Sequence, residues 1–210
     1  MDKATGDRRT HRVAAERTVF TFAFLSAAAE HAISNGRARR GGSFFEWMTA
    51  AVFSAFSLEA YLNQLGPQRF NCWNELERLS VEAKLSLILE DLGKRPDFSR
   101  RPFQTVKMLL RLRNQLAHGN TERVEEETIQ TLLPGERPRY PAVKWEALCT
   151  AEHAERFHED SMAVIRQLDE WTGDANPFLF SPEEGWSTTL PIEGADQENR
   201  AHAKKRRGSF

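Results

Sequence analysis

The stretch VKMLLRLRNQLAHGN, residues 106–120, most constrains the fold, because its apolar residues recur at steps of three and four. These apolar residues are Val106, Leu109, Leu110, Leu112, Leu116 and Ala117. Such spacing places them along one side of a helix. Gly119 stands where a helix would end. The stretch therefore predicts an amphipathic helix with the polar groups of Arg113, Asn114 and His118 set into it.

Four other segments share this helical spacing. They span residues 11–34, 43–65, 80–92 and 151–171. Ser43 and Glu46 match a capping box at the start of the second segment, and Gly66-Pro67 is expected to end it. Together with a helix over residues 102–119, they predict an all-α fold, an up-and-down bundle of four to five helices.

The apolar positions also predict which side of each helix is buried. The stripe predicted for the first helix consists of Val13, Phe20, Phe24, Ala27 and His31. The stripe of the second consists of Phe45, Met48, Val52, Ala55, Phe56 and Leu62. The helices over 80–92 and 151–171 are expected to bury Leu85, Ile88, Leu89 and Leu92, and Ala154, Phe157, Met162, Ile165, Leu168 and Trp171.

Glu59 falls within the stripe of the second predicted helix. A carboxylate on an apolar face is costly unless it meets a cation or hydrogen-bond donors. Arg113 is our candidate partner for it. The alternative is that Glu59 flanks the stripe and reaches water.

Two parts of the chain lack helical periodicity. Residues 121–144 are acidic and then rich in proline and glycine, which predicts a long irregular excursion before the last helix, either a lid or a simple loop. The chain beyond Gly173 is turn-rich and is expected to be loosely ordered. We therefore expect a flexible N-terminus over residues 1–11, a helical domain over 12–172 and a C-terminal tail over 173–210.

Cysteine usage and hydropathy narrow the class of protein. Cys72 and Cys149 are the only cysteines, which suggests neither a disulfide framework nor a zinc site. The longest apolar runs are about a dozen residues, short of the ~20 that a membrane span needs. Glu155-x-x-His158 occurs once, whereas di-iron bundles need two such motifs. We expect a cytoplasmic protein without membrane contact, metal or other cofactor.

A basic run leads into the central predicted helix. Residues 94–113 hold seven Lys or Arg and one acid, Asp97. Such a run raises local affinity for phosphate, because each cation that meets a phosphate releases condensed counterions. The candidate phosphate contacts are Arg100, Arg101, Lys107 and Arg111. The alternative is a solvated face and loop.

Residues 113–118, RNQLAH, form an Arg-x4-His pattern at the end of an amphipathic helix. Asn114 directly follows the Arg, and Gly119 directly follows the His. This arrangement resembles the motif of the HEPN superfamily of all-helical domains, many of which are metal-independent endoribonucleases. Residues 56–63, FSLEAYLN, resemble the family's earlier helix, which carries a Glu on its inner face. The resemblance covers about residues 12–172.

The resemblance implies a role for each polar residue. RNA carries its own nucleophile, the 2′-hydroxyl, so its cleavage needs a proton acceptor and a cation. His118 is implied as general base or acid, because the unperturbed pKa of histidine lies near neutrality. Arg113 is implied as an electrostatic clamp, because a guanidinium matches phosphate oxygens. Asn114 would position the substrate by hydrogen bonding, and Glu59 would support Arg113.

The resemblance also implies a homodimer. Five residues at 100° each place Arg113 and His118 about 140° apart on an ideal helix, so one copy makes a poor active site. The family's two-fold dimers bring two motif helices together into one composite cleft. We expect the same arrangement here, with the motif helix near the interface.

The implied function is an endoribonuclease that acts as a toxin or phage-defence effector, with RNA, a second copy and an antitoxin or defence protein as partners. Asn120 stands where toxins paired with nucleotidyltransferase antitoxins carry Tyr, so silencing by adenylylation is not expected. Two alternatives stay open. In one, Arg113 only pairs with Glu59, and His118 only caps its helix. In the other, the chain is a non-catalytic HEPN-like adapter that dimerises and binds a partner protein or nucleotide.

Overall fold

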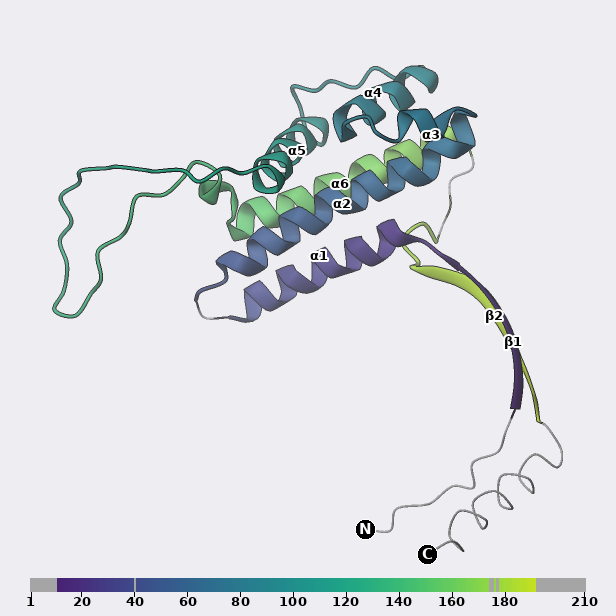
Figure 1. Cartoon of the computed structure of the whole chain (residues 1–210), viewed down its shortest axis with the longest axis horizontal. Coiled ribbons are helices and arrows are strands. Elements are labelled where there is room, and N and C mark those ends of the chain that lie inside the picture. Colours follow the sequence, from purple (N-terminus) through teal and green to yellow (C-terminus); the bar gives the residue numbers. More distant parts are fainter. Residues whose placement is uncertain (1–10, 40, 174–175, 177, 192–210) are drawn as a thin grey trace, which may run out of the picture. The chain divides into compact units, whose positions relative to one another are not determined.

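The computed structural model describes residues 11–39, 41–173, 176 and 178–191. The chain divides into two units. The larger is a helical unit, Phe20–Pro182, and the smaller is built from the residues on either side of it (Figure 1). The expectation of a mainly helical fold is confirmed, with a small two-stranded sheet added to it. Among the described residues, no helix combines the length and the apolar character that crossing a bilayer requires.

The described part of the smaller unit is an antiparallel ribbon. Strand β1, His11–Val19, pairs with strand β2, Glu183–Pro191, so that Val19 lies opposite Glu183. The predicted helix over 11–34 is therefore wrong for its first nine residues. The predicted domain limits shift as well, because the helical unit begins at Phe20 and continues to Pro182. The partner strand is distant in sequence, so local periodicity gives no sign of the pairing.

The expected loose tail is also wrong over 183–191, which form β2. The expected flexible residues before His11 and the tail beyond Pro191 lie outside the described residues.

The helical unit contains six described α-helices and one 3₁₀ turn (Figure 1). The helices are α1 Thr21–Ala38, α2 Phe44–Arg69, α3 Trp73–Leu76, α4 Val81–Asp91, α5 Phe103–Ala117 and α6 Ala151–Thr172. The 3₁₀ turn, η1, spans Glu146–Leu148. The hydroxyls of Ser80 and Thr150 cap α4 and α6, and Gly93 and Gly173 follow them with positive φ of 64° and 93°. The predicted positions of α4, α5 and α6 are confirmed within a few residues.

Small residues form the contact between α1 and α2. Ala23, Ala29 and Ala32 are buried on α1, and Ala50, Ala51 and Ala55 are buried on α2. The Ser57 hydroxyl of α2 donates to the Phe22 carbonyl oxygen of α1 at 2.8 Å, which holds the two helix backbones close to each other. Such small side chains allow helix axes to approach closely, so bulky residues must point elsewhere.

The buried stripes predicted for α1 and α2 are therefore wrong in phase. Phe24 is 43% exposed, and Ala27 and His31 are also exposed. On α2, Phe45 is 68% exposed and Phe56 is 37% exposed, although Ala55 and Leu62 are buried as predicted. The aromatic side of α2 faces outward because the small-residue side binds α1.

Both ends of α2 differ from the prediction. Ser43 donates its hydroxyl to the Gly36 carbonyl at 2.9 Å, and Glu46 pairs with Arg39, so the capping box does not form. Gly66-Pro67 does not end the helix, which continues to Arg69. A Cβ at Gly66 would overlap the indole of the buried Trp73. This glycine serves the close packing of α3 against α2 and not helix termination.

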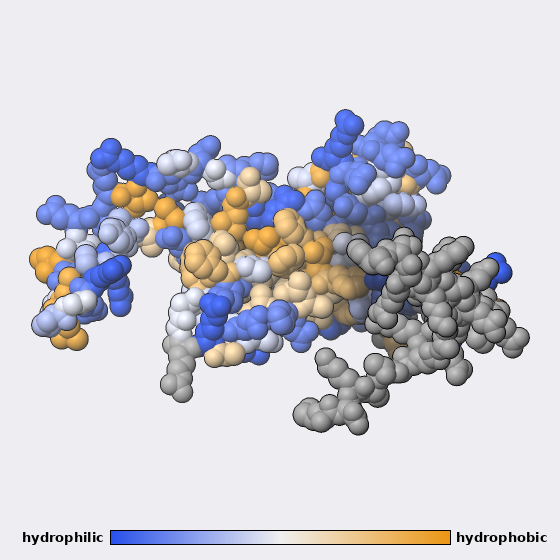
Figure 2. Space-filling model, turned by 60° about the horizontal axis from the view of Figure 1, so that its bottom comes forward, coloured by the Kyte–Doolittle hydropathy of each residue, from blue (hydrophilic) through white to orange (hydrophobic). Residues whose placement is uncertain are grey.

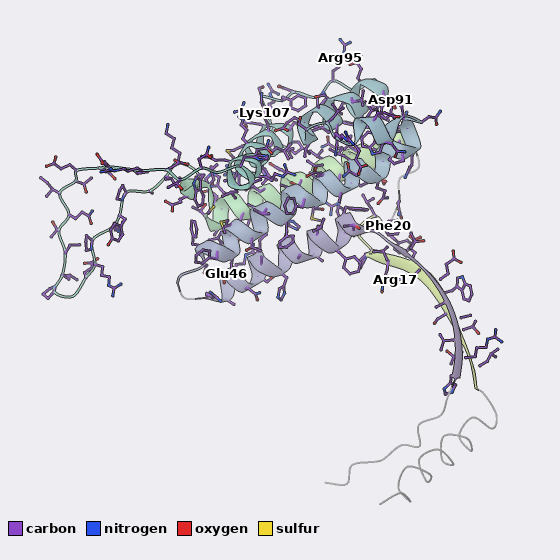
Figure 3. All side chains as sticks on the ribbon, viewed as in Figure 1. Arg17, Phe20, Glu46, Asp91, Arg95 and Lys107 are labelled. Carbon is purple, nitrogen blue, oxygen red and sulfur yellow. The ribbon has the colours of Figure 1, made fainter. Side chains whose placement is uncertain are left out.

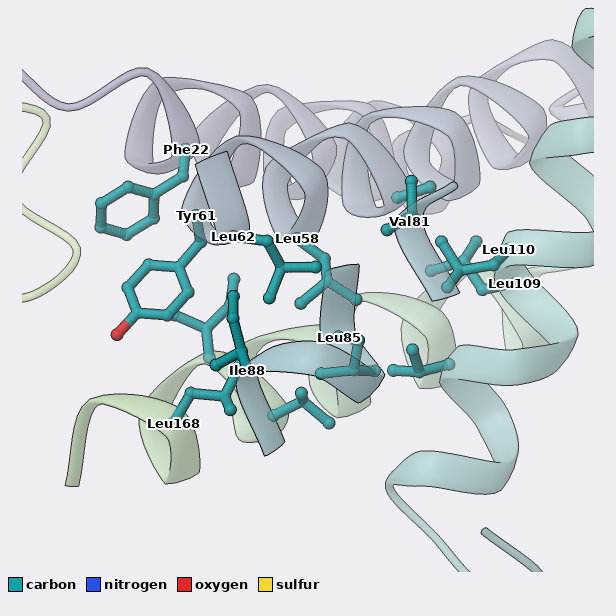
Figure 4. Packing of buried hydrophobic residues seen from close by; sticks show 14 of the residues in the cluster. Phe22, Leu58, Tyr61, Leu62, Val81, Leu85, Ile88, Leu109, Leu110 and Leu168 are labelled. Atoms are coloured by element: carbon teal, nitrogen blue, oxygen red, sulfur yellow. The ribbon is translucent and has the colours of Figure 1, made fainter. Parts of the chain in front are cut away.

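One apolar core joins α1, α2, α4, α5 and α6. Figure 4 shows it between the helices, with Phe22 and Tyr61 at one end and Leu109 and Leu110 at the other. Most residues expected to be buried on the last three helices lie in it, whereas Leu92, Leu116, Met162 and Trp171 are half-buried and Ala117 is exposed.

Residues 119–144, hereafter the arm, leave the helical unit as an irregular excursion, as predicted (Figure 1). Arg139 and Gln130 hydrogen-bond across it, and Gly135 makes its turn with φ of 87°. The chain returns at Trp145, whose ring lies 6.1 Å from that of Phe44. The arm therefore starts at the end of α5 and ends at the start of α2.

The Gly66–Trp73 packing gives a stability prediction. We expect Gly66→Val to lower the free energy of unfolding by roughly 2–3 kcal/mol, because an overpacked site forces its neighbours apart. Gly41→Val is the control, since a Cβ at Gly41 meets nothing within 4 Å. Urea denaturation of the three proteins measures the difference. Equal midpoints for Gly66→Val and the wild type would contradict the assigned packing.

Candidate functional site

The site starts from the outward face of α2. Phe45, Met48, Val52, Phe56, Glu59 and Asn63 follow one another at steps of three or four, so they share that face. The first four form an apolar stripe, hereafter the α2 stripe. Glu59 and Asn63 continue the stripe as polar groups at the point where α4 and α5 meet α2.

Arg113 of α5 binds Glu59 of α2. The guanidinium Nη2 lies 2.6 Å from Glu59 Oε2, and Nη1 donates to Asn114 Oδ1 at 2.9 Å. The guanidinium also lies 5.6 Å from the centre of the Phe56 ring, where a cation is attracted to the aromatic face. The predicted pairing of Glu59 with Arg113 is confirmed. Both side chains are about a quarter exposed, at 24% and 22%, so solvent can reach the pair.

Lys84 of α4 joins this group, although the sequence analysis did not single it out. Its side chain is only 3% exposed. The ammonium Nζ donates to Asn63 Oδ1 at 2.8 Å and lies 3.9 Å from Glu59 Oε1. Its spacing in the sequence could have revealed it. Lys84 shares one face of α4 with Val81, Leu85 and Ile88, and lysine is rare on a buried apolar face.

These five residues form one polar cluster, hereafter the Arg113 cluster. Its members are Glu59, Asn63, Lys84, Arg113 and Asn114. The cluster holds two cations and one carboxylate, and each Glu59 oxygen faces one of the cations. Arg113 Nε is buried and has no hydrogen-bond partner among the described residues. The cluster therefore carries one positive charge more than its carboxylate neutralises, which suits it to an anion.

His118 stands at the C-terminal end of α5, outside the contacts of this cluster. Its backbone N–H donates to the Asn114 carbonyl at 3.0 Å, and its side chain is exposed. The imidazole makes no hydrogen bond or ion pair with any residue that the structure describes. One turn separates it from Asn114, whose amide is bound to Arg113. Asn114 is thus the link between the imidazole side of α5 and the guanidinium.

The basic residues predicted to contact phosphate separate into two groups. Lys107 and Arg111 are exposed on α5 and share a face with Asn114 and His118, at steps of four, three and four. Figure 3 shows Lys107 on the outer side of the helix. This outward side of α5, hereafter the α5 polar face, combines two exposed cations, an amide and an imidazole.

Arg100 and Arg101 are engaged elsewhere. Arg101 binds Asp160 of α6 through Nε at 2.8 Å and Nη2 at 2.9 Å, and its pKa is raised by that carboxylate. Arg100 lies 3.3 Å from Asp97. Arg101 therefore joins the loop before α5 to α6, and Arg100 pairs within that loop while its side chain stays 84% exposed. Their contact with phosphate stays a prediction.

The Glu155-x-x-His158 motif of α6 is used in packing. Glu155 accepts from Arg37 Nε at 2.7 Å, which joins α6 to α1. His158 is half-buried, and burial lowers its pKa below the ordinary value. Among the described residues, no group of three or more His, Cys, Asp or Glu side chains is arranged so that it could hold a metal ion.

Comparisons with protein-family models, with curated proteins and with solved structures found no match to this chain. The chemistry of the site must therefore be argued from its residues and their geometry.

The lowered pKa of His158 gives a pH dependence of stability. As pH falls through the ordinary histidine range, the unfolded chain takes up a proton that folded His158 resists, so folding stability decreases. We expect His158→Gln, which does not titrate, to lose less stability than wild type between about pH 7 and pH 5. Urea denaturation across that range measures this. Identical pH profiles for the two proteins would rule out the contribution.

Proposed function

We propose that the protein is a metal-independent endoribonuclease of HEPN type. The observation that carries the proposal is the α5 polar face, where Lys107, Arg111, Asn114 and His118 align beside the Arg113 cluster. Cations along one helix face can bind successive phosphates of a strand. The exposed imidazole of His118 at the end of that face is the candidate proton donor or acceptor.

The proposed reaction uses the RNA 2′-hydroxyl. His118 removes its proton, the 2′-oxygen forms a bond to phosphorus, and the bond from phosphorus to the 5′-oxygen breaks. The leaving 5′-oxygen takes a proton from a second imidazole. The products are a 2′,3′-cyclic phosphate and a 5′-hydroxyl. Arg113 stabilises the negative charge that builds up on the phosphate oxygens, and Asn114 orients the phosphate.

A second copy would supply the second imidazole. The α2 stripe is uncovered, with Phe45 68% and Phe56 37% exposed. Apolar side chains gather on the face of the helical unit seen in Figure 2. Exposed apolar surface of this kind marks association sites. Because the stripe leads directly to Glu59 and Arg113, a two-fold contact along it would bring two α5 helices and both His118 side chains to one groove.

We further propose that the enzyme acts as a toxin or phage-defence effector, with a partner protein that restrains it. Cleavage of RNA by a free enzyme would damage its own host, so such an activity needs control.

One observation favours a second candidate, a non-catalytic helical adapter that dimerises and binds a partner protein or nucleotide. Arg113 is already bound by Glu59 and Asn114 within its own chain. A purely structural role, in which Arg113 joins α5 to α2, would account for these contacts. An adapter would need no more than the α2 stripe to bind its partner.

Ribonuclease assays separate the two candidates. We expect the wild type to cleave single-stranded RNA in EDTA and to leave 2′,3′-cyclic phosphate ends. His118→Ala should lower the rate by about 10²–10⁴-fold, the usual contribution of a general acid or base. Arg113→Ala should also lose activity, because the phosphate loses its clamp. The exposed His31 of α1 is the control, and His31→Ala should keep the wild-type rate. Undiminished cleavage by both His118→Ala and Arg113→Ala would refute the proposal.

The proposed dimer has its own test. We expect Phe45→Glu to convert a dimer to a monomer in light scattering coupled to size exclusion, because Phe45 is the most exposed residue of the stripe and a charge within an apolar contact is costly to bury. RNA cleavage should fall with the dimer fraction. Leu79→Glu is the control, since Leu79 is 39% exposed but lies off the α2 stripe. A Phe45→Glu protein that remains dimeric would place the interface elsewhere.

A further inference from the structure

We propose that Lys84 is a positioning residue of the Arg113 cluster, which holds Glu59 so that Arg113 keeps positive charge available for an RNA phosphodiester. The inference rests on the proposed function, because it names the group that prepares the phosphate clamp. Lys84 itself, at 3% exposure, does not reach the substrate.

The first step concerns the partners of Lys84. A buried ammonium needs compensation, and a neutral amide oxygen supplies only part of it. The hydrogen bond from Lys84 to Asn63 Oδ1 at 2.8 Å is of that kind. The only nearby carboxylate that the described residues provide is Glu59, at 3.9 Å. Lys84 therefore depends on a carboxylate that is also bound to Arg113.

The second step concerns what this sharing does to Arg113. Glu59 places Oε1 towards Lys84 and Oε2 on Arg113. The carboxylate is thereby fixed in one orientation, and its charge is divided between two cations. Without Lys84, Glu59 would neutralise Arg113 fully, and the guanidinium would attract a phosphate less strongly. Lys84 thus sets both the orientation and the remaining charge of the clamp.

The third step separates this role from packing. An apolar side chain of similar length would fill the same place on α4 without the cost of burying a charge. A lysine at this position is therefore not required for the core. Replacing Lys84 by Met should leave stability unchanged or raise it, while it weakens phosphate binding.

The probe is a labelled single-stranded 2′-O-methyl RNA oligonucleotide, which lacks the attacking hydroxyl and so reports binding without cleavage. We expect Lys84→Met to raise its Kd by about tenfold, equal to about 1.4 kcal/mol, in fluorescence anisotropy at fixed salt. The kcat/KM for cleavable RNA should fall with it, and the Tm should not fall. Lys144→Met is the control, because it removes the same charge from an exposed lysine in the arm.

A second variant tests the charge balance and keeps Lys84 in place. Asn63→Asp puts a carboxylate beside the ammonium and makes the cluster neutral. It should weaken oligonucleotide binding as Lys84→Met does, whereas Asn71→Asp, at an exposed position, should not. If Lys84 acts through Glu59, Lys84→Met should have no further effect on Kd in a Glu59→Gln background.

The outcomes separate this inference from the proposed function. Lys84-dependent oligonucleotide binding without any RNA cleavage would leave the inference standing and refute the ribonuclease. Cleavage and binding by Lys84→Met and Asn63→Asp at wild-type levels would refute the inference alone. A wild type that neither binds the oligonucleotide nor cleaves RNA would refute both. If Lys84→Met does not fold, the Asn63→Asp protein alone tests the inference, and oligonucleotide binding at the wild-type level by that protein would refute it.

Discussion

The close packing of α1 against α2 is the constraint on which the rest of the helical unit depends. Alanines and serines fill this contact, and the Ser57 hydroxyl binds the Phe22 carbonyl across it. Because small side chains occupy the inner side of α2, Phe45 and Phe56 turn outward. The same rotation directs Glu59 and Asn63 towards α4 and α5. The polar site and the apolar surface beside it therefore have one structural cause.

The Arg113 cluster shows how a helical core can keep charge near its surface. Three helices each contribute at least one polar side chain, and every described contact among them is a hydrogen bond or an ion pair at 2.6–3.9 Å. Removing its one carboxylate, Glu59, would leave both Lys84 and Arg113 without a counter-charge in the cluster. The cluster therefore joins α2, α4 and α5 in one fixed arrangement, and the exposed imidazole of His118 stands at the end of the last of these.

The sequence predicted those features that depend on local spacing. Helix α5, its end within a few residues of Gly119, and the contact of Glu59 with Arg113 follow from apolar periodicity and from one carboxylate on an apolar face. The prediction failed where the neighbouring helix decides which side of a helix is buried. The phase of α1 and α2 depends on which side binds the neighbouring helix, and bulky residues misled the prediction. Lys84 was missed because a lysine in an amphipathic helix is ordinarily assigned to the solvent side, whereas Lys84 lies on the buried side of α4. The strand pairing of residues 11–19 has no local signal at all.

The ribbon has a consequence for how the chain is completed. Strand β1 precedes the described helices and β2 follows them. The Phe20 N–H donates to the Pro182 carbonyl at 2.9 Å where the helical unit starts and stops. Contacts so distant in sequence form late, because a long loop must close first. During translation β1 must wait, unpaired, until β2 has left the ribosome. A chain that terminates before β2 would therefore leave β1 with an open β edge, to which another strand could pair.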